Sequence, residues 1–322
     1  MKTYFFLCET NDAWRNLATD EYFLNHAPEG GILLHIYINA PSVIIGKSQN
    51  AWGECNLRAM ERDGVKLVRR ITGGGAVYHD LGNVNFSFIA HQSVYDVQRQ
   101  MGVILKAVQK LGIRAEFSGR NDLLAEGRKF SGNAFCIRAE GRQHHGTLLL
   151  SADLTRLSGY LNVSDEKLKS KGIASVRSRV CNLCELNGQI TADKMIEALK
   201  QSFAAEYGSF QNWELGPAAR REIEELYEKH SSWQWRLGQA PRFDLELRKR
   251  FSWGEVQVLL SFRQAHVSHA QVFSDALDPD LAENLAGMLV GVRFCAADLC
   301  AAIHPKKGEY AEIAQWLGSL EY

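Results

Sequence analysis

The sequence lacks four features that would assign it to a broad class of protein at once. It has no net charge, because its 322 residues include 37 Lys and Arg against 37 Asp and Glu. It has no apolar run of the ~20 residues that a membrane-spanning helix requires. It also has no internal repeat and no low-complexity tract. These absences argue against a generally basic nucleic-acid-binding protein and against a membrane protein, although zero net charge still permits local charged patches.

Cysteine is present, but its distribution predicts no disulfide framework. The seven cysteines are odd in number and scattered along the chain (Cys8, Cys55, Cys136, Cys181, Cys184, Cys295 and Cys300). Reduced thiols in a cytoplasm agree better with this pattern than a secreted, cross-linked domain does. The first residues show no apolar segment followed by a small-residue cleavage site, so no secretory signal is expected. We therefore expect a soluble cytoplasmic protein.

Length and periodicity predict two α/β domains. Apolar residues at helical spacing predict helices near 13–26, 97–111, 191–207 and 217–230. Alternating or short apolar runs predict strands near 33–38, 42–45, 65–70, 84–88, 113–117, 123–125, 129–131 and 148–150. The pattern then restarts, with strands near 256–262 and 270–273 and helices from about 280. The fold class is thus α/β (α+β), with a large mixed-sheet domain over residues 1–244 and a small C-terminal α/β domain over residues 245–322.

Two short motifs invite a functional interpretation that their surroundings do not support. Gly46-Lys47-Ser48 resembles the end of a phosphate-binding P-loop, but the position of the required first glycine is occupied by Pro41. Cys181 and Cys184 have the spacing of half a zinc site, but no second pair accompanies them. We expect a turn in the first case and no metal site made by the protein alone in the second.

The most informative stretch runs from Arg69 to Asp80 and contains three consecutive glycines, Gly73 to Gly75. Consecutive glycines between two strands cost ordering entropy, and the usual compensation is a close backbone approach to a ligand or a positive φ. Exposed N–H groups in such a loop can hold phosphate or carboxylate oxygens, and the adjacent arginines would add anion recognition. The alternative is a glycine-rich hairpin with solvent-exposed arginines.

A second cluster surrounds a predicted hairpin with Glu126-Gly127 at its turn. Strand alternation places Lys129 and Ser131 on one face and Arg128 and Phe130 on the other. A lysine on the inner face would place a positive charge beside a reacting oxygen. An exposed basic hairpin is the alternative. The adjacent His144 and His145 point to opposite faces of a strand and so cannot chelate one ion together.

A third cluster is the basic segment over residues 165–180, which carries five positive and two negative charges. Its positive residues are Lys167, Lys169, Lys171, Arg177 and Arg179. A mobile loop that closes over an anionic phosphate and a solvated loop face are both compatible with this composition.

Taken together, these segments resemble the lipoate–protein ligases, in their long form with a C-terminal accessory domain. The resemblance rests on an ordered set of motifs along the whole chain. Its members are 69–83 around the glycines, Gly119-Arg120-Asn121-Asp122, Arg128-Lys129-Phe130-Ser131-Gly132, His144–Leu149, Lys171–Val180, Gln49–Asn56 and Ser231-Ser232-Trp233. It implies the biotin/lipoate ligase type of catalytic domain.

The resemblance also implies a two-step reaction. ATP, with Mg²⁺, activates (R)-lipoate to lipoyl-AMP, and the lipoyl group then passes to a lysine of an apo lipoyl domain. Such domains occur in the E2 subunits of 2-oxoacid dehydrogenases and in the glycine cleavage H protein. No nucleic-acid or membrane partner is implied, and a monomer is expected. The sequence does not distinguish lipoate from octanoate as the preferred acid.

The same resemblance assigns roles to individual residues. Lys129 is the predicted catalytic residue, which would contact the lipoyl carbonyl and the α-phosphate. The predicted ATP and lipoyl-AMP site consists of Arg70, Gly75, Ala76, Val77, Tyr78, His79, Asn83, Asp122, Lys129, His145, Thr147 and Arg179. The predicted lipoate tunnel consists of Gly73, Gly74, Gly75 and Phe86, with Val77 as a further candidate.

Two other functions remain possible on this evidence. One is a lipoyl or octanoyl transferase on the same scaffold, which takes its acyl group without ATP-dependent activation and relies on a nucleophilic cysteine such as Cys136 or Cys181. The other is a non-enzymatic lipoate or biotin sensor, although neither a biotin-ligase arginine–glycine signature nor an N-terminal helix-turn-helix is present.

Overall fold

The computed structural model describes residues 1–118, 122–161, 180–238, 243–263, 265–304 and 307–320. The chain divides into two compact units. Unit 1 consists of Met1–Ile45, Ala51–Ile71 and Ala76–Gly238, and unit 2 consists of Gly46–Asn50, Thr72–Gly75 and Gln239–Tyr322. The sequence analysis predicted two domains that are each continuous in sequence, residues 1–244 and 245–322. In the structure, two short N-terminal segments, one of them containing the glycines, instead belong to the C-terminal unit.

Over the described part of the chain, the large sheet of unit 1 has eight strands in the order β11-β1-β2-β6-β10-β9-β8-β7. These strands are β1 (Lys2–Leu7), β2 (Gly31–Ile38), β6 (Asn83–His91), β7 (Ala115–Ser118), β8 (Asp122–Ala125), β9 (Arg128–Arg138), β10 (Gly141–Leu149) and β11 (Gln211–Asn212). The pairs β1–β11 and β1–β2 are parallel, and the remaining pairs are antiparallel. The predicted mixed sheet is therefore confirmed.

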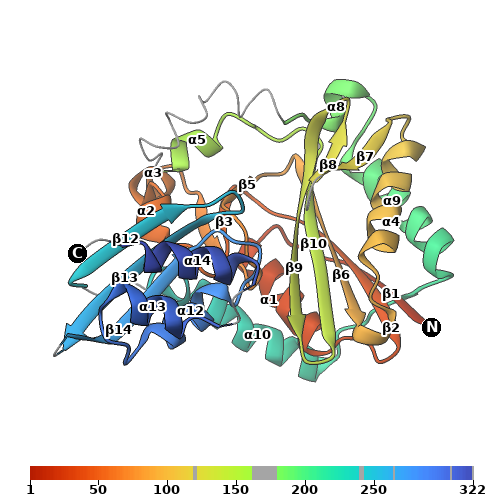
Figure 1. Cartoon of the computed structure of the whole chain (residues 1–322). Helices are drawn as coiled ribbons and strands as arrows, with labels where there is room; N and C mark the ends of the chain where they lie inside the picture. Colours follow the sequence, from red (N-terminus) through yellow and green to blue (C-terminus); the bar gives the residue numbers. More distant parts are fainter. Residues whose placement is uncertain (119–121, 162–179, 239–242, 264, 305–306, 321–322) are drawn as a thin grey trace. The chain divides into compact units, whose positions relative to one another are not determined.

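Helices cover both faces of this sheet (Figure 1). On one face lie α4 (Val97–Lys110) and α9 (Ala192–Tyr207), which bury an apolar core that includes Phe86, Phe88 and Phe203. On the other face lie α1 (Ala13–Asn25) and α10 (Pro217–Ser231). Asp12 caps α1 by accepting a hydrogen bond from the N–H of Trp14. Two covered faces explain why the central strands are buried along nearly their whole length.

Unit 1 also contains a separate three-stranded sheet in the order β4-β3-β5. Two of its strands, β4 and β5, contain the beginning and the end of the glycine-containing stretch 69–80. Its strands are β3 (Ser42–Ile45), β4 (Lys66–Arg69) and β5 (Val77–His79). The small helices near it are α2 (Ala51–Glu54), α3 (Leu57–Arg62), α5 (Leu157–Tyr160) and α11 (Trp233–Leu237). The described part of unit 1 also contains α8 (Leu183–Leu186) and the 3-10 helix η1 (Gln92–Val94).

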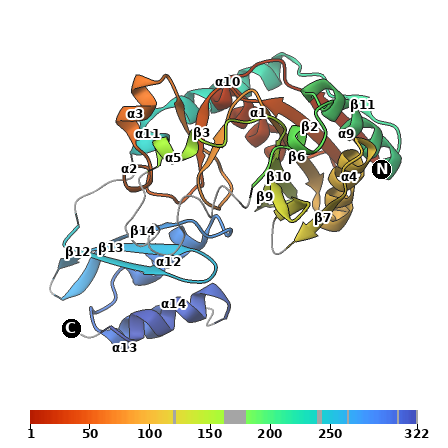
Figure 2. The same cartoon turned by 90° about the horizontal axis from the view of Figure 1, so that it is seen from above.

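In its described residues, unit 2 contains a three-stranded antiparallel sheet in the order β12-β13-β14 and the helices α12, α13 and α14 (Figure 2). Its elements are β12 (Leu245–Arg250), β13 (Glu255–Arg263), β14 (His266–Ser274), α12 (Leu281–Leu289), α13 (Ala296–Ala302) and α14 (Glu309–Gly318). It has an apolar core of its own, which includes Val258, Leu285 and Ile313. A small C-terminal α/β unit with its own core agrees with the predicted fold class. No helix in the described ranges is both long and apolar enough to cross a bilayer.

Candidate functional site

The two consecutive arginines at the end of β4 have different roles. Arg69 is fully buried, and its guanidinium donates hydrogen bonds to the carbonyl oxygens of Trp235 and Arg236, each at 2.9 Å. Arg69 therefore anchors α11 rather than serving as an anion-binding group. Neighbouring residues of a strand point to opposite sides, so Arg70 is directed elsewhere.

Arg70 is also buried, and its Nη1 donates to the carbonyl oxygen of Ile44 at 3.1 Å. Burial lowers the pKa of Arg70 to about 10, which leaves the guanidinium positively charged at neutral pH. A hydrogen bond to a carbonyl oxygen orients this cation without neutralising its charge. Arg70 thus has the character expected of a phosphate- or carboxylate-binding residue.

His79 at the end of β5 is held in one tautomer by a chain of amides. Asn16 Nδ2 donates to Asn39 Oδ1 at 2.8 Å, and Asn39 Nδ2 therefore faces His79 Nδ1 at 2.9 Å as a donor. Burial, followed by the nearby charges of Arg70 and His145, lowers the pKa of His79 to about 3. The ring is consequently neutral with its proton on Nε2, which is buried and has no hydrogen-bond partner among the described residues. The result is a fixed, unused N–H donor.

One face of the large sheet carries the next predicted residues, His145, Thr147 and Asn83. The register pairs His145 with Ser87 and Thr147 with Asn85, so these side chains lie on the face covered by α1. Asp20 of α1 is buried, and its Oδ2 lies 3.4 Å from His145 Nδ1. Asn83 Nδ2 donates to Asn85 Oδ1 at 2.8 Å, and the buried Asn83 Oδ1 has no partner among the described residues.

Lys129 on β9 forms an ion pair with Asp122 on β8, with 2.6 Å between Lys129 Nζ and Asp122 Oδ1. About a third of each side chain is exposed. Asp122 and Lys129 come from two separate motif segments, the one that ends at Asp122 and the one over Arg128–Gly132. The hairpin formed by β8 and β9 brings them together. Its turn has positive φ at both Glu126 and Gly127, which is the predicted two-residue type.

The prediction that Lys129 and Ser131 share one face is wrong because a β-bulge interrupts the alternation. Ser131 pairs with Leu123, and Lys129 pairs with the very next residue, Leu124. Since Leu123 and Leu124 point to opposite faces, so do Ser131 and Lys129. Ser131 is fully buried, whereas the Lys129 ammonium lies on the side of Asp122.

Gly132 gives the Lys129 side chain its space. A Cβ atom at Gly132 would lie 3.1 Å from Lys129 Nζ and 3.2 Å from Cε. The Gly132 N–H also donates to Thr147 Oγ1 at 3.3 Å, which connects the lysine strand to β10. The position of the Lys129 ammonium therefore depends on the absence of a side chain at residue 132.

The glycines 73–75 belong to unit 2, and the structure explains two of them. A Cβ at Gly73 would collide with the carbonyl oxygens of Leu277 and Ala276. Gly74 has φ of +92° and donates its N–H to the Ala276 oxygen at 2.7 Å. The close approach predicted for this loop is thus made, within unit 2, by another stretch of backbone. Gly75 is exposed, and no atom lies within 4 Å of its Cβ position.

The remaining predicted residues have mixed placements. Tyr78 is buried and stacks on Tyr160, while Ala76 and Val77 are partly buried and pack against the cores of the small sheet. Phe86 lies in the apolar core beneath α4 and α9, on the opposite face of the sheet from His145. The structure therefore does not bring Phe86 together with the polar residues. Arg179 and the basic segment up to that residue lie outside the described ranges.

Sequence reasoning missed Asp20 and Asn39, which organise the two histidines. Asp20 hydrogen bonds to His35 and His145, and these interactions outweigh burial and hold the pKa of its carboxyl well below its usual range. The available signal was a pair of adjacent acidic residues, Asp20 and Glu21, between the apolar residues of a predicted helix. In the described ranges, no group of three or more His, Cys, Asp or Glu side chains could hold a metal ion.

Two family models match the chain. The family model for the lipoyl protein ligase A/B catalytic domain matches residues 12–204. The chain belongs to the lipoate–protein ligase family. A second model, for the C-terminus of bacterial lipoate protein ligases, matches residues 240–317. The resemblance drawn from the sequence motifs is therefore confirmed.

Solved structures of lipoate–protein ligases have the same fold over most or all of the chain. P. falciparum LipL1 in complex with lipoate is 27% identical, with a TM-score of 0.87 over 99% of this chain and 100% of that chain. A bipartite lipoate protein ligase from Thermoplasma acidophilum, described with its E2 lipoyl domain, is 30% identical. It has a TM-score of 0.69 over 76% of this chain and 100% of its own. A lipoate-protein ligase A bound with ATP is 28% identical, with a TM-score of 0.66 over 74% of this chain and 100% of that chain.

Proposed function

We propose that this chain is an ATP-dependent lipoate–protein ligase that carries out both steps of protein lipoylation. In the first step, a carboxylate oxygen of (R)-lipoate attacks the α-phosphorus of ATP, the bond to pyrophosphate breaks, and lipoyl-AMP forms. In the second step, the ε-amine of a lysine on an apo lipoyl domain attacks the carbonyl carbon. The bond to AMP breaks, an amide forms, and the amine loses a proton to solvent.

The observation that carries this proposal is the Lys129–Asp122 pair. A lysine ammonium held 2.6 Å from a carboxylate is already positioned before any anion binds. Partial exposure leaves it accessible to the α-phosphate and the lipoyl carbonyl. A fixed cation stabilises the charge that grows on the phosphoryl oxygens and on the tetrahedral oxyanion.

Arg70 and His79 support the same assignment. Arg70 supplies a second positive charge, which is buried, and His79 supplies a neutral N–H donor with no partner among the described residues. A donor that is already desolvated and fixed needs no reorganisation when a phosphate or carboxylate oxygen arrives. We propose that Arg70, His79, Asn83, His145 and Thr147 bind the acyl-adenylate, with Tyr78 and Val77 beside them. The proposed roles of Gly73, Gly74, Gly75, Ala76 and Arg179 rest on the motif resemblance alone.

We propose that Mg²⁺ reaches the site as part of the nucleotide substrate and shields the triphosphate. The proposed acceptors are apo E2 lipoyl domains and the glycine cleavage H protein, because one relative was described with its E2 lipoyl domain. The cysteines form no disulfide bond among the described residues, which supports a reducing compartment such as the cytoplasm. We take the active species to be a monomer.

The principal rival is the transferase that takes an acyl group from a carrier without ATP. Such an enzyme needs a reactive cysteine at the acyl site. Cys136 and Cys181 are both buried, and burial raises the pKa of the Cys181 thiol. Buried thiols of this kind are poor nucleophiles, which favours the ligase over the transferase.

The decisive experiment compares Lys129→Ala with the wild-type chain in lipoate-dependent ATP–pyrophosphate exchange. We expect the variant to keep its fold, judged by circular dichroism, and to lose adenylation by a factor of about 10² or more. Lys110→Ala is the matched control, because Lys110 lies at the exposed end of α4. Undiminished exchange in Lys129→Ala would remove Lys129 from the mechanism.

A second experiment tests the reaction class itself. The chain is incubated with lipoate and an apo H protein or E2 domain, with and without MgATP, and the acceptor is weighed by mass spectrometry. A gain of one lipoyl group that requires ATP supports the ligase. Transfer that proceeds without ATP, and is lost in Cys136→Ser or Cys181→Ser, would establish the transferase instead.

A further inference from the structure

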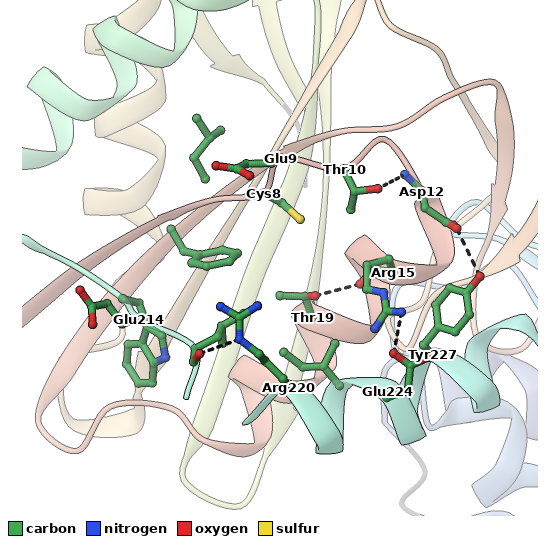
Figure 3. A pocket seen from close by; sticks show the side chains of 15 residues that line it. Cys8, Glu9, Thr10, Asp12, Arg15, Thr19, Glu214, Arg220, Glu224 and Tyr227 are labelled. Carbon is green, nitrogen blue, oxygen red and sulfur yellow. Dashed lines mark hydrogen bonds and ion pairs between the residues drawn. The ribbon is translucent and has the colours of Figure 1, made fainter. Parts of the chain in front are cut away.

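A cavity of about 910 Å³ lies in unit 1 beside the end of β1, and several of its charged side chains pair with one another (Figure 3). Arg15 Nη2 pairs with Glu224 Oε2 at 2.7 Å, and the Tyr227 hydroxyl donates to Asp12 Oδ2 at 3.3 Å. Within the described part of the chain, none of the lining side chains has a buried polar atom without a hydrogen-bond partner. A buried polar cluster that does contain such an atom lies under α4, on the opposite face of the large sheet.

This cluster consists of Gln100 on α4, Asn133 on β9 and His144 on β10, and we call it the amide–histidine cluster. The three residues are at most 4% exposed. His144 Nδ1 lies 3.0 Å from Gln100 Oε1, and His144 Nε2 lies 2.9 Å from Asn133 Oδ1. The His144 ring therefore connects α4 to the strand that carries Lys129.

The His144 ring is neutral and has a single N–H to donate. Burial, followed by the charge of His145, lowers the pKa of His144 to about 3. One of the two amides must therefore accept from the ring, and the other must donate to it. Gln100 Nε2 is buried and has no partner among the described residues, which makes Gln100 the amide that turns its NH₂ group to the ring. His144 Nε2–H then donates to Asn133 Oδ1.

Asn133 lies where β9 separates from β10. The hydrogen-bond ladder between these two strands ends at the pair Asn133–Gly146. β10 stays paired with β6 as far as Leu149, whereas Arg128–Gly132 of β9 pairs with β8. We call Arg128–Gly132 the lysine arm. Its placement relative to β10 is set at Asn133, because the ladder that would otherwise fix it has ended there.

Individual contacts hold the lysine arm where the ladder ends. The Gly132 N–H donates to Thr147 Oγ1 at 3.3 Å, and the Lys129 carbonyl oxygen accepts from the Cys181 N–H at 2.9 Å. A β-bulge interrupts the pairing of the arm with β8. A segment with an interrupted ladder depends on such contacts for its position, and the amide–histidine cluster supplies a buried one at its end.

The Lys129 ammonium depends on this placement because its side chain lies against Gly132. A Cβ atom at Gly132 would lie 3.1 Å from Lys129 Nζ, and the same Nζ lies 2.6 Å from Asp122 Oδ1. A shift of about 1 Å in a reacting group can lower a rate about 10²-fold. The geometry of the arm therefore affects the chemistry proposed for Lys129.

We propose that Asn133, His144 and Gln100 are positioning residues that fix the lysine arm and thereby the Lys129 ammonium. This inference rests on the proposed function, since that function places Lys129 at the reacting atoms. None of the three residues contacts the substrates in this account. They act through the backbone at Gly132.

The first test removes the acceptor at Asn133 without a large change in size. Asn133→Leu has no oxygen at this position, whereas Asn133→Asp keeps one. In lipoate-dependent ATP–pyrophosphate exchange, we expect Asn133→Leu to lower kcat about 10-fold and to change the KM for lipoate by less than about 2-fold. We expect Asn133→Asp to recover most of the lost activity. Equal losses in the two variants, or a loss that appears mainly in KM, would overturn the positioning role.

Phe135→Leu is the matched control. The Phe135 ring stacks on His144 with 5.0 Å between the ring centroids, but Phe135 lies within the β9–β10 ladder rather than at its end. We expect Phe135→Leu to lower the Tm while keeping kcat. A loss of kcat equal to that of Asn133→Leu would show that packing around His144, and not the hydrogen bond, controls the activity, and it would overturn the proposal.

The second test measures the Lys129 amine directly and requires no catalysis. The full chain is acetylated with an N-hydroxysuccinimide ester, and the rate at Lys129 is compared by mass spectrometry with that at Lys110, an exposed residue of α4. A neighbouring carboxylate favours the charged form of an amine, which does not react, so displacement from Asp122 raises the rate. We expect the ratio to rise at least about 3-fold in Asn133→Leu and to stay unchanged in Asn133→Asp. An unchanged ratio in folded Asn133→Leu would overturn the proposal.

The two tests separate this inference from the proposed function. Absence of lipoate-dependent exchange in the wild-type chain would refute the proposed function, and the acetylation ratio would still decide how Lys129 is positioned. If Asn133→Leu does not fold, Gln100→Leu releases the same ring from α4 and replaces it with the same expectations. If neither variant folds, the amide–histidine cluster is a requirement for folding, and the positioning role is overturned.

Discussion

Asn39 Nδ2 lies 2.9 Å from His79 Nδ1, and this hydrogen bond decides which nitrogen of the histidine carries the proton. Because the Asn39 amide is itself oriented by Asn16, His79 presents Nε2–H as a fixed donor. Two residues that sequence reasoning did not select therefore define the chemistry of one that it did.

This relationship predicts different effects for two substitutions of His79. His79→Gln can place an amide N–H near the former Nε2, whereas His79→Ala removes the donor. We expect lipoate-dependent pyrophosphate exchange to fall by about 10²-fold in His79→Ala and much less in His79→Gln. Equal losses in two variants that both fold would contradict a donor role and indicate a packing role.

The space beside Gly132 predicts an effect on activity without a large effect on stability. A Cβ at this position would lie 3.1 Å from Lys129 Nζ, so Gly132→Ala should displace the flexible end of the lysine. We expect adenylation to fall about 10-fold while thermal unfolding changes little. Gly102→Ala is a suitable control, because nothing lies within 4 Å of its Cβ position. Full activity in Gly132→Ala would show that the ammonium position is not critical.

Two nearby glycine positions should respond differently to alanine. Gly73→Ala would push a methyl group into the Ala276 and Leu277 carbonyls, whereas Gly75→Ala meets no atom within 4 Å. We expect Gly73→Ala to lower the Tm by roughly 3–10 °C and Gly75→Ala to leave it nearly unchanged. Calorimetry of the full chain measures both values. A similar Tm for the two variants would contradict the close backbone packing.

Glu21 should make stability depend on acid pH. Burial raises the pKa of this carboxyl, but hydrogen bonds and charges from His230 and Lys229 outweigh it and lower the pKa from 4.5 to about 2. Since the folded pKa lies below the unfolded one, the stabilisation is fully present above about pH 5. It is lost as the pH falls from there toward 2.

The test is Glu21→Gln, compared with wild type by urea denaturation between pH 7 and pH 3. We expect the variant to be less stable by about 3 kcal/mol at pH 7, because Lys229 and His230 lose their buried partner. The difference should shrink as the pH falls. Glu225→Gln, on the exposed side of α10, is the control. A difference that stays constant with pH would contradict the ion-pair account.

Much of the local structure was predictable from the sequence. The helix over 13–26, the strand over 42–45 and the turn at Glu126-Gly127 were predicted within a residue or two, because periodicity and turn chemistry are local. The predictions for β9 and β10 were too short, since their continuing residues include Asn133, His144 and His145 rather than an apolar run. β1 and β12 were missed altogether.

The site was predicted as a set of residues but not as an arrangement. Motif resemblance selected Arg70, His79, Lys129 and His145, yet it could not separate the roles of Arg69 and Arg70 or locate the bulge that moves Ser131 away from Lys129. The contacts of the two arginines and the position of the bulge both depend on strand order and register.

Most of the element types, the two-part α/β organisation and the family followed from the amino-acid sequence, since these depend on local periodicity and on ordered motifs. Tertiary structure alone decided which face each polar side chain occupies, why Gly73 cannot carry a side chain, and which donors in the site remain without a described partner. The physical reason is that burial and hydrogen bonding between residues distant in sequence depend on strand order and register, which neighbouring residues do not specify.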